Sequence, residues 1–583
     1  MKKICSTTIL CILFLVPSAA YSQGPGQGPG PGAAQGEFQP LGDAPVPAEN
    51  PITEAKRVLG KILFWDEQLS SDNTVACGTC HQPAAGGSDL RLGMNPGFDQ
   101  IFGTDDDVVG SPGIKRLDNS GQPLVHPLFG LEAQVTDRAS PSFFTSMFAG
   151  SNFWDGRARD QFVDPLDGSS VVISSGGALE SQAIVPILST VEMAREGRTW
   201  TDVVNKLQQV QPLALASNIP PDMVDALVGN QLYGDLFEQA FGDSEITPAR
   251  IGLAIATYER TLVPNETPWD LYIAGNDTAM TASQIAGWES FIDTPCANCH
   301  EPPRFSNDDF HNIGLRPSAE DLGLFDVSGQ NNQRGDFKTP SLRNVGLRRA
   351  LMHVGWVTDV EDALDFYNAG TSSTGHMQFL EDQDGIPGNP LDINALDIFA
   401  EDDTARAQFL DFMINGLTDP RVASESFPFD RPTLASETMT SASPVSITGI
   451  NSGNTATDAS FRISVLDSAG QGGNDFARTD VLTIAANIAV DPADVGNSAR
   501  LFCVVIYNGA MFARNEAGVF TLWDGNEATL PAMDTRVLTA VEVVSIVQGL
   551  SNVPGQFQLY VAYENENQQL VYSGSPATFS VAP

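Results

Sequence analysis

Two copies of one five-residue pattern constrain this chain more than any other feature. Residues 77–81 read CGTCH and residues 296–300 read CANCH, so these units use four of the seven cysteines. Cys5 and Cys11 lie near the N-terminus in an apolar leader, which leaves Cys503 as the remaining cysteine. Because four cysteines fall in two identical units, a framework of disulfides is not expected. Cys503 is expected to be a buried apolar residue.

The spacing of the repeated pattern indicates its chemistry. Two thiols at this spacing can form thioether bonds to the two vinyl groups of one haem, and the adjacent histidine can then bind the iron. A zinc site needs four ligands, usually from paired units close together, and a thioredoxin-like redox pair does not need the histidine. The pattern therefore predicts two covalent c-type haems. Their attachment residues are Cys77, Cys80, His81, Cys296, Cys299 and His300, with the two histidines on the iron.

The first residues of the chain indicate export. Lys2 and Lys3 precede a short apolar run, and small residues follow that run. This order is typical of a cleaved signal peptide, here over residues 1–22, and the run is too short to span a bilayer. We therefore expect a periplasmic or secreted protein without a membrane span.

The chain is strongly acidic, with a formal net charge of −41. Such a surface repels nucleic acid and anionic lipid, and it attracts basic partners. It is also typical of a surface that keeps an exported protein soluble. We therefore expect no nucleic-acid partner.

Composition divides the mature chain into segments. Residues 23–47 are rich in glycine and proline and are expected to form a flexible tether. Residues 48–240 and residues 241–434 each contain one Cys-x-x-Cys-His unit, so each is expected to form one haem domain. From residue 440 to 583, β-rich runs alternate with Gly, Asn and Asp, which predicts a β-sandwich of unknown role.

The two haem domains are expected to be helical. In residues 247–263, apolar residues recur at helical spacing, and Thr247 followed by Pro248 is typical of a helix start. The expected fold class is therefore mainly α, with two cytochrome c-like haem domains followed by an all-β sandwich domain.

Six motifs occur along residues 50–434 in a characteristic order. They are LGKILFWDEQLSSDNTVACGTCH, FWDGRA, ESQAIVPILSTVEM, CANCH, FHNIG and FKTPSLRNV. In order and wording they resemble the bacterial di-haem cytochrome c peroxidase family, including its MauG branch. The resemblance implies that the first haem is the peroxidatic one and that the second haem transfers electrons to it.

The resemblance also implies roles for three residues of the first haem domain. Trp154 of FWDGRA matches a tryptophan that relays electrons between the haems, Gln182 matches a glutamine on the peroxide side, and Glu192 matches the acid–base group. These roles are chemically reasonable. A carboxylate over the iron can move a proton between peroxide oxygens, an amide can orient the peroxide, and an indole can be oxidised.

The sixth ligand of the second haem is expected to be a tyrosine. The resemblance places it fourteen residues after the histidine of an H-x-G motif, here His353, which leads to Tyr367. Peroxidases of the family have methionine there, whereas the MauG branch has tyrosine. A phenolate lowers the haem potential relative to a thioether. Met352 and Met377 remain the alternative ligands.

Two departures from the family concern the first haem and a calcium ion. Where relatives often have a distal histidine, this chain has Leu131. The distal position is therefore open, or is filled by His126 or Met94. An asparagine that binds calcium between the haems in the family is replaced by Ala139, which leaves the presence of Ca²⁺ undecided.

These features predict an oxidoreductase. The expected activity is reduction of hydrogen peroxide at the first haem, with electrons from a small exported cytochrome c or copper protein passing through the second haem. One alternative is a MauG-like oxidase that uses peroxide on a protein or organic substrate, and another is a di-haem oxygenase. A non-catalytic electron-transfer protein is a further alternative, and the resemblance allows a homodimer.

Overall fold

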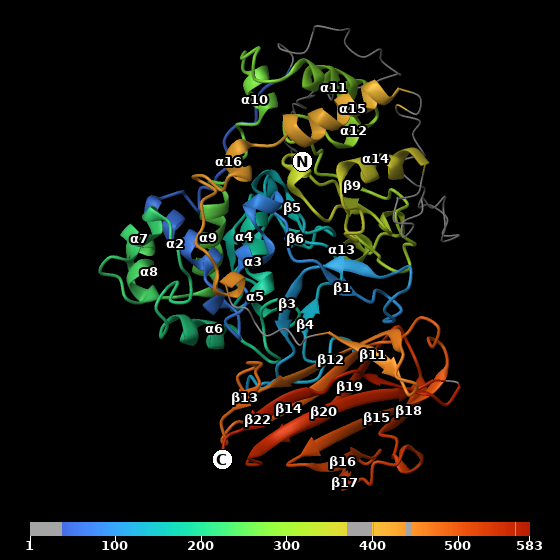
Figure 1. The fold of residues 1–583 in the computed structure, drawn as a ribbon. Helices are drawn as coiled ribbons and strands as arrows, with labels where there is room; N and C mark the ends of the chain where they lie inside the picture. Colours follow the sequence, from blue (N-terminus) through green and yellow to red (C-terminus); the bar gives the residue numbers. More distant parts are fainter. Residues whose placement is uncertain (1–37, 370–398, 400–401, 439–445, 566) are drawn as a thin grey trace, which may run out of the picture.

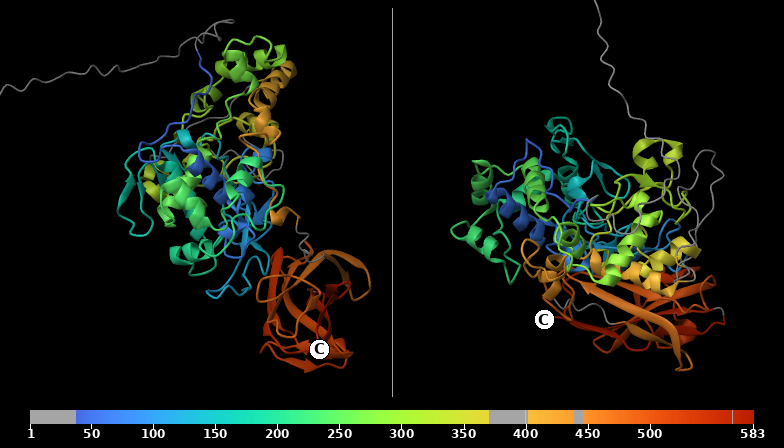
Figure 2. Two further views of the ribbon diagram at one scale, coloured as in Figure 1. Left: turned by 90° about the vertical axis from the view of Figure 1, so that its left-hand side faces the viewer. Right: turned by 90° about the horizontal axis from the view of Figure 1, so that it is seen from above.

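The computed structural model describes residues 38–369, 399, 402–438, 446–565 and 567–583. Helices and irregular segments form one part of the molecule, and a large curled sheet lies at one end (Figure 1). Two further views show the same separation (Figure 2). No helix of the described residues is long and apolar enough to cross a membrane.

The expectation of a mainly α fold is wrong. Only 27% of the residues are helical and 23% are in strands. The C-terminal strands account for most of the difference, and Gly-, Pro- and Asp-rich segments between the helices form short strand pairs or irregular loops. Such residues favour turns, because glycine adopts positive φ and proline lacks an N–H donor.

The first helical core forms around α2 (Glu54–Trp65) and α9 (Pro248–Glu259). The side chain of Thr247 accepts a hydrogen bond from Arg250 N at 3.2 Å, so the predicted helix start is confirmed. A Cβ on Gly60 would lie 1.9 Å from the Ala254 carbonyl oxygen, so only glycine permits this helix contact. Other helices here are α3 (Cys77–Cys80), α4 (Ala178–Ala183), α5 (Val185–Leu188), α6 (Trp200–Leu207), α7 (Pro221–Leu227) and α8 (Tyr233–Phe241).

The second helical core is built from aromatic residues. Trp269, Trp288, Phe291, Phe305 and Phe412 are fully buried and touch one another through their ring edges and faces. The helices around this core are α10 (Pro268–Ile273), α11 (Ala282–Asp293), α12 (Cys296–Cys299), α13 (Phe325–Ser328), α14 (Val360–Ala369) and α15 (Asp403–Asp411). The chain then returns through α16 (Pro420–Ala423) and α17 (Ala435–Thr438), and Leu434 is buried in the first core.

The C-terminal strands join into a single twelve-stranded sheet instead of two separate sheets. The pairs are antiparallel except β13 with β22. The sheet curls around a core that includes Phe461, Ile484, Leu501, Cys503 and Val561, all buried. The strands are β11 (Ile447–Asn451), β12 (Ala456–Leu466), β13 (Asp475–Phe476), β14 (Leu482–Ala489), β15 (Ser498–Tyr507), β16 (Ala510–Arg514), β17 (Phe520–Leu522), β18 (Asp534–Val537), β19 (Val541–Leu550), β20 (Gly555–Glu564), β21 (Leu570–Ser573) and β22 (Ala577–Val581).

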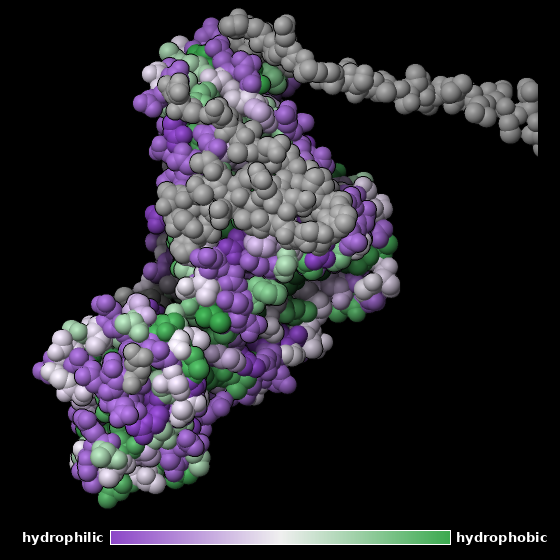
Figure 3. Space-filling model, turned by 90° about the vertical axis from the view of Figure 1, so that its right-hand side faces the viewer, coloured by the Kyte–Doolittle hydropathy of each residue, from purple (hydrophilic) through white to green (hydrophobic). Residues whose placement is uncertain are grey.

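The sheet contacts the inserted segment that follows the first Cys-x-x-Cys-His unit. This segment contains β1 (Gly93–Asn95), β2 (Val108–Gly110), β3 (Pro112–Lys115) and β4 (Ala133–Val135). Lys115 Nζ donates to the Gly470 carbonyl oxygen at 2.9 Å. In Figure 3 the molecule narrows between the sheet and the helical part, and apolar residues are exposed in this region.

Candidate functional site: two Cys-x-x-Cys-His centres

The two Cys-x-x-Cys-His units have the same local structure. In each unit the cysteines lie on a single-turn helix, α3 or α12, and the histidine follows at its C-terminal end. The N–H of His81 donates to the Cys77 carbonyl at 3.1 Å, and that of His300 donates to the Cys296 carbonyl at 2.9 Å. All four thiols are free of disulfides. We call the unit 77–81 the first site and the unit 296–300 the second site.

Both histidines are held in the tautomer that suits an iron ligand. Nδ1 of His81 lies 3.1 Å from the Gly87 carbonyl oxygen, and Nδ1 of His300 lies 3.1 Å from the Phe305 carbonyl oxygen. A carbonyl only accepts, so Nδ1 carries the proton and the lone pair of Nε2 is free to bind metal. Burial lowers the pKa of both rings, that of His300 to about 4. The rings are therefore neutral, and the residues of both sites fit a covalently bound haem.

Glu192 lies close to the first site. Its negative charge is one cause of the raised pKa of both the Cys77 and the Cys80 thiol, after burial, so the carboxylate lies within electrostatic reach of both. Burial also raises the pKa of Glu192 itself, against a lowering hydrogen bond from Ser189. A Cβ on Gly113 of β3 would lie 1.9 Å from the Val191 carbonyl oxygen, so β3 packs directly against the backbone beside Glu192.

Gln182 lies on α4, one short helix before the turn that presents Glu192. It is partly buried. No hydrogen bond within the described residues joins its amide to Glu192. The expected roles of Gln182 on the peroxide side and Glu192 as the acid–base group therefore stay predictions.

Trp154 is buried beside the first site. Its Nε1 donates to the Ala139 carbonyl oxygen at 2.8 Å. Ser140 follows Ala139 in the chain, and its hydroxyl lies 3.3 Å from His81 Nδ1. The N–H of Ala139 donates to the His353 carbonyl oxygen at 2.8 Å. The centroids of the Trp154 and His353 rings are 6.3 Å apart.

The same tryptophan is also connected to the second site. The N–H of Lys338 donates to the Trp154 carbonyl oxygen at 2.9 Å. The hydroxyl of Ser306 donates to the Thr339 carbonyl at 2.7 Å, and Ser306 follows Phe305, whose carbonyl accepts from His300. Short backbone and side-chain steps therefore connect Trp154 to both proximal histidines.

Tyr367 lies on α14, close to the second site. Burial raises the pKa of its phenol, and the charges of Cys296 and Cys299 raise it further, so the hydroxyl is near both thiols. Of the alternatives, Met352 packs against the second helical core. Met377 lies outside the described residues.

The segment that the resemblance assigns to the distal side of the first haem packs against the C-terminal sheet. Leu131 is 3% exposed and packs against Leu466 and Ala485. Nδ1 of His126 accepts hydrogen bonds from the N–H groups of Leu128 at 3.0 Å and Phe129 at 3.2 Å. These bonds occupy Nδ1 and place the ring proton on Nε2, which is the opposite tautomer from that of His81. Met94 lies on β1 and is 38% exposed.

Two buried ionisable residues near the sites were not found by sequence reasoning. Glu259 on α9 is 3% exposed, burial raises its pKa to about 8, and its charge acts on the Cys77 thiol. Arg348 is 8% exposed; its side chain lies beside Gly86, near the first site, and its charge acts on His300 of the second site. For Glu259 the available signal was a charged residue in a helix whose other residues are mostly apolar, and nothing in the sequence around Arg348 indicated its burial. Within the described residues, no group of three or more His, Cys, Asp or Glu side chains is arranged to hold a metal ion.

Two Cys-x-x-Cys-His centres on one chain, with a tryptophan between them, define a c-type protein with two haems. Residues 54–278 match the di-haem cytochrome c peroxidase family. A methylamine utilization protein MauG from Methylorubrum extorquens is 30% identical over 351 residues, which are 60% of this chain and 78% of that protein. The chain belongs to the di-haem cytochrome c peroxidase family, and it is therefore an oxidoreductase with haem c cofactors.

Other relatives carry both names of the family. A cytochrome c551 peroxidase from Pseudomonas aeruginosa is 28% identical over 325 residues, which are 54% of this chain and 72% of that protein. A crystal structure of a MauG-like protein associated with microbial copper homeostasis is 21% identical, with a TM-score of 0.44. The match covers 67% of this chain and 96% of the MauG-like protein.

Proposed function

We propose that this chain is an exported enzyme that reduces hydrogen peroxide at the first site with electrons delivered through the second. The names of the relatives support peroxide as the substrate. The observation that carries the proposal is Glu192, a partly buried carboxyl whose charge acts on both thiols of the first site and whose neighbour Val191 packs against β3. A non-catalytic electron carrier would not need a carboxyl there.

The haem bound at the first site would supply the iron on which peroxide is reduced. Glu192 would take the proton from the peroxide oxygen nearer the iron and return it to the leaving oxygen, which departs as water. Desolvation raises the pKa of Glu192 above that of a free carboxyl, which favours its use as a proton donor as well as an acceptor. Gln182 would orient the peroxide, and Trp154 would carry electrons from the side of the second site.

The electron donor would be a small exported protein. A net charge of −41 favours a basic cytochrome c or copper protein, because opposite charge accelerates encounter and orients docking. Export itself rests on the leader over residues 1–22, and the proposed location is the periplasm or the exterior. Calcium has no support from the described residues, and dimer formation stays an expectation from the family.

The second candidate function is MauG-like oxidation of a protein or organic substrate. The observation in its favour is Tyr367, whose phenol lies near Cys296 and Cys299. A phenolate ligand at the second haem would hold its potential low, which disfavours delivery of electrons from an ordinary donor and favours withdrawal of electrons from a substrate.

Steady-state turnover separates these functions. The purified protein would be mixed with hydrogen peroxide and a reduced basic cytochrome c, and in parallel with a reduced copper protein. Fast oxidation of either donor supports the peroxidase. Slow oxidation with a long-lived optical change after stoichiometric peroxide supports the MauG-like function. No optical change and no donor oxidation would contradict both.

A further inference from the structure

Arg348 is a buried cation that forms no ion pair with a carboxylate among the described residues. It is 8% exposed and directly follows the turn Val345–Leu347. One terminal nitrogen of its guanidinium donates to the carbonyl oxygens of Ser341 at 2.9 Å and Arg343 at 2.8 Å. Its Nε is buried and has no hydrogen-bond partner among the described residues.

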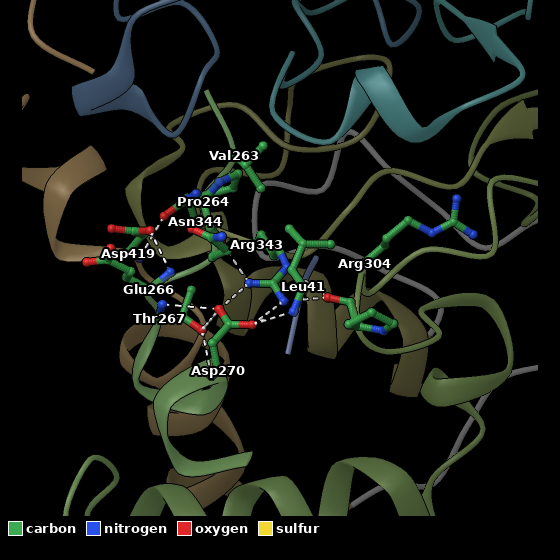
Figure 4. A network of polar contacts seen from close by, with 12 residues as sticks. Leu41, Val263, Pro264, Glu266, Thr267, Asp270, Arg304, Arg343, Asn344 and Asp419 are labelled. Atoms are coloured by element: carbon green, nitrogen blue, oxygen red, sulfur yellow. Dashed lines mark hydrogen bonds and ion pairs between the residues drawn. The ribbon is translucent and has the colours of Figure 1, made fainter. Parts of the chain in front are cut away.

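A neighbouring arginine shows what a satisfied guanidinium looks like in this protein. Arg343 is fully buried and forms two bonds to the Asp270 carboxylate, at 2.6 and 2.8 Å (Figure 4). It also donates to the carbonyl oxygens of Pro264 and Pro303. The hydrogen-bond partners of Arg348 within the described part of the chain are all carbonyl oxygens. A buried charge without an opposite charge is strongly destabilising, so Arg348 needs an anion that the described part of the chain does not provide.

The guanidinium of Arg348 stays charged at neutral pH. Burial lowers its pKa to about 10, and no carboxylate acts against that shift. An arginine in this state binds a carboxylate well, because its planar fork offers parallel N–H donors.

The position of Arg348 is between the two proximal histidine loops. Gly86 has φ +62°, and a Cβ on it would lie 2.5 Å from the Asn344 carbonyl oxygen and 3.0 Å from Arg348 Cγ. The next residue, Gly87, accepts the hydrogen bond of His81 Nδ1. On the other side, the charge of Arg348 is one of the causes that lower the pKa of His300, after burial. The cation therefore lies near both sites at once.

We propose that Arg348 binds a haem propionate between the two sites and raises the reduction potential of the haem system. The inference rests on the proposed function in one respect, that haems are attached at both units. A propionate is the anion that such a cofactor brings into a buried pocket, and it would satisfy the unpaired charge. A cation near the irons stabilises the reduced state, because reduction lowers the positive charge on each iron.

Arg348→Gln tests this assignment by removing the charge while keeping an amide donor. The matched control is Arg349→Gln, which removes the same charge from the adjacent, exposed position. Haem per chain would be measured by the pyridine haemochrome assay, and the midpoint potentials by optical redox titration over a range of pH. We expect Arg348→Gln to lower the midpoint potential of at least one haem by about 59 mV. For a one-electron couple this shift is a tenfold change in the reduction equilibrium. Arg349→Gln should leave both potentials in place.

A second expected result is a new pH dependence. Without its guanidinium partner the propionate loses the interaction that keeps its pKa low, so it titrates closer to neutral pH. Its deprotonation stabilises the oxidised haem, so the potential of Arg348→Gln should fall as pH rises through that new pKa.

Arg348→Lys separates charge from structure. Lysine keeps the cation but loses the fork, so its potentials should lie near those of the unaltered protein. Potentials of Arg348→Lys as low as those of Arg348→Gln would overturn the proposal, as would an Arg348→Gln protein with two haems and unmoved potentials. Both results would leave the proposed function intact. Fewer than two haems in the unaltered protein would instead contradict the proposed function itself.

Discussion

The two Cys-x-x-Cys-His sites hold their histidines in the same way but differ in the ionisable side chain that interacts with their thiols. His81 and His300 each donate Nδ1–H to a backbone carbonyl a few residues further along the chain, at 3.1 Å in both cases. The carboxyl of Glu192 interacts electrostatically with the thiols of the first site, whereas the phenol of Tyr367 interacts with those of the second. The comparison teaches that the two attachment units share one local structure and that the ionisable residue near the thiols distinguishes the two centres.

The largest expected effect comes from Glu192. Glu192→Gln should slow the reaction with peroxide by about 10²-fold or more, the usual scale for losing a general acid–base group. In the unaltered enzyme the rate should fall as pH drops through the raised pKa of Glu192, because the protonated carboxyl cannot accept a proton. The variant should lose this dependence. Stopped-flow absorbance with stoichiometric peroxide across a pH series measures both.

The matched control is Glu196→Gln. Glu196 pairs with Arg116 at 2.9 Å and is 40% exposed, so its loss should leave the rate unchanged. Equal slowing in the two variants, or an unchanged rate in Glu192→Gln, would remove Glu192 from the proposed mechanism.

Tyr367→Met should make the second centre more like that of an ordinary peroxidase. Replacing a phenolate by a thioether should raise the potential of the second haem by about 100 mV or more, since axial ligands tune haem potentials over a wide range. Optical redox titration measures the shift. Met352→Leu serves as the control and should change nothing. If only Met352→Leu shifts the potential, the ligand is Met352 and not Tyr367.

Leu131→Ala should weaken the contact between the inserted segment and the C-terminal sheet. Leu131 is 3% exposed against Leu466 and Ala485, and truncating a buried leucine costs about 2 kcal/mol or more of unfolding free energy. Denaturant unfolding followed by tryptophan fluorescence measures the loss. Leu522→Ala is the control, because Leu522 is 74% exposed. Because the Leu131 segment is assigned to the first haem, Leu131→Ala should change the absorbance of the first haem and leave that of the second constant. A change confined to the second haem would contradict the assignment of this segment to the first haem.

The smallest expected effect belongs to His126. Its Nδ1 is occupied by two backbone N–H groups, so His126→Ala should leave the absorbance spectrum of the ferric protein unchanged. Loss of a low-spin band would instead show that His126 binds the first iron in solution, and the distal side would then not be open.

Several features of the fold were predictable because they depend on neighbouring residues. Thr247 and Pro248 begin α9 as expected, since capping is a local hydrogen bond. The β-rich runs after residue 440 are strands, but they form one curled sheet and not a sandwich of two sheets. The mainly α expectation failed because helical periodicity in a few segments was extended to long Gly- and Pro-rich connections that do not form helices.

In the candidate site, too, the features that depend on local motifs were predictable, and those that depend on long-range contacts were not. The resemblance led to Glu192 and Tyr367, and the structure places each near a thiol pair, while the roles of both stay predictions. Nothing in the pattern around Leu131 indicated that the distal segment would pack against the C-terminal sheet, because their contact joins residues more than 300 positions apart. The burial of the Arg348 guanidinium was not predicted, because the sequence does not show whether a carboxylate from a distant segment will pair with an arginine.

By itself, the sequence determined the two haem-attachment units, since the spacing of two thiols and a histidine within five residues is set by one helical turn. The tertiary structure alone decided which carboxyl is buried beside the first thiols, which arginine lacks a counter-charge and which loop the sheet contacts. These outcomes depend on burial and on long-range contacts, and the cost of an unpaired charge or a buried carboxyl exists only once distant segments have excluded water.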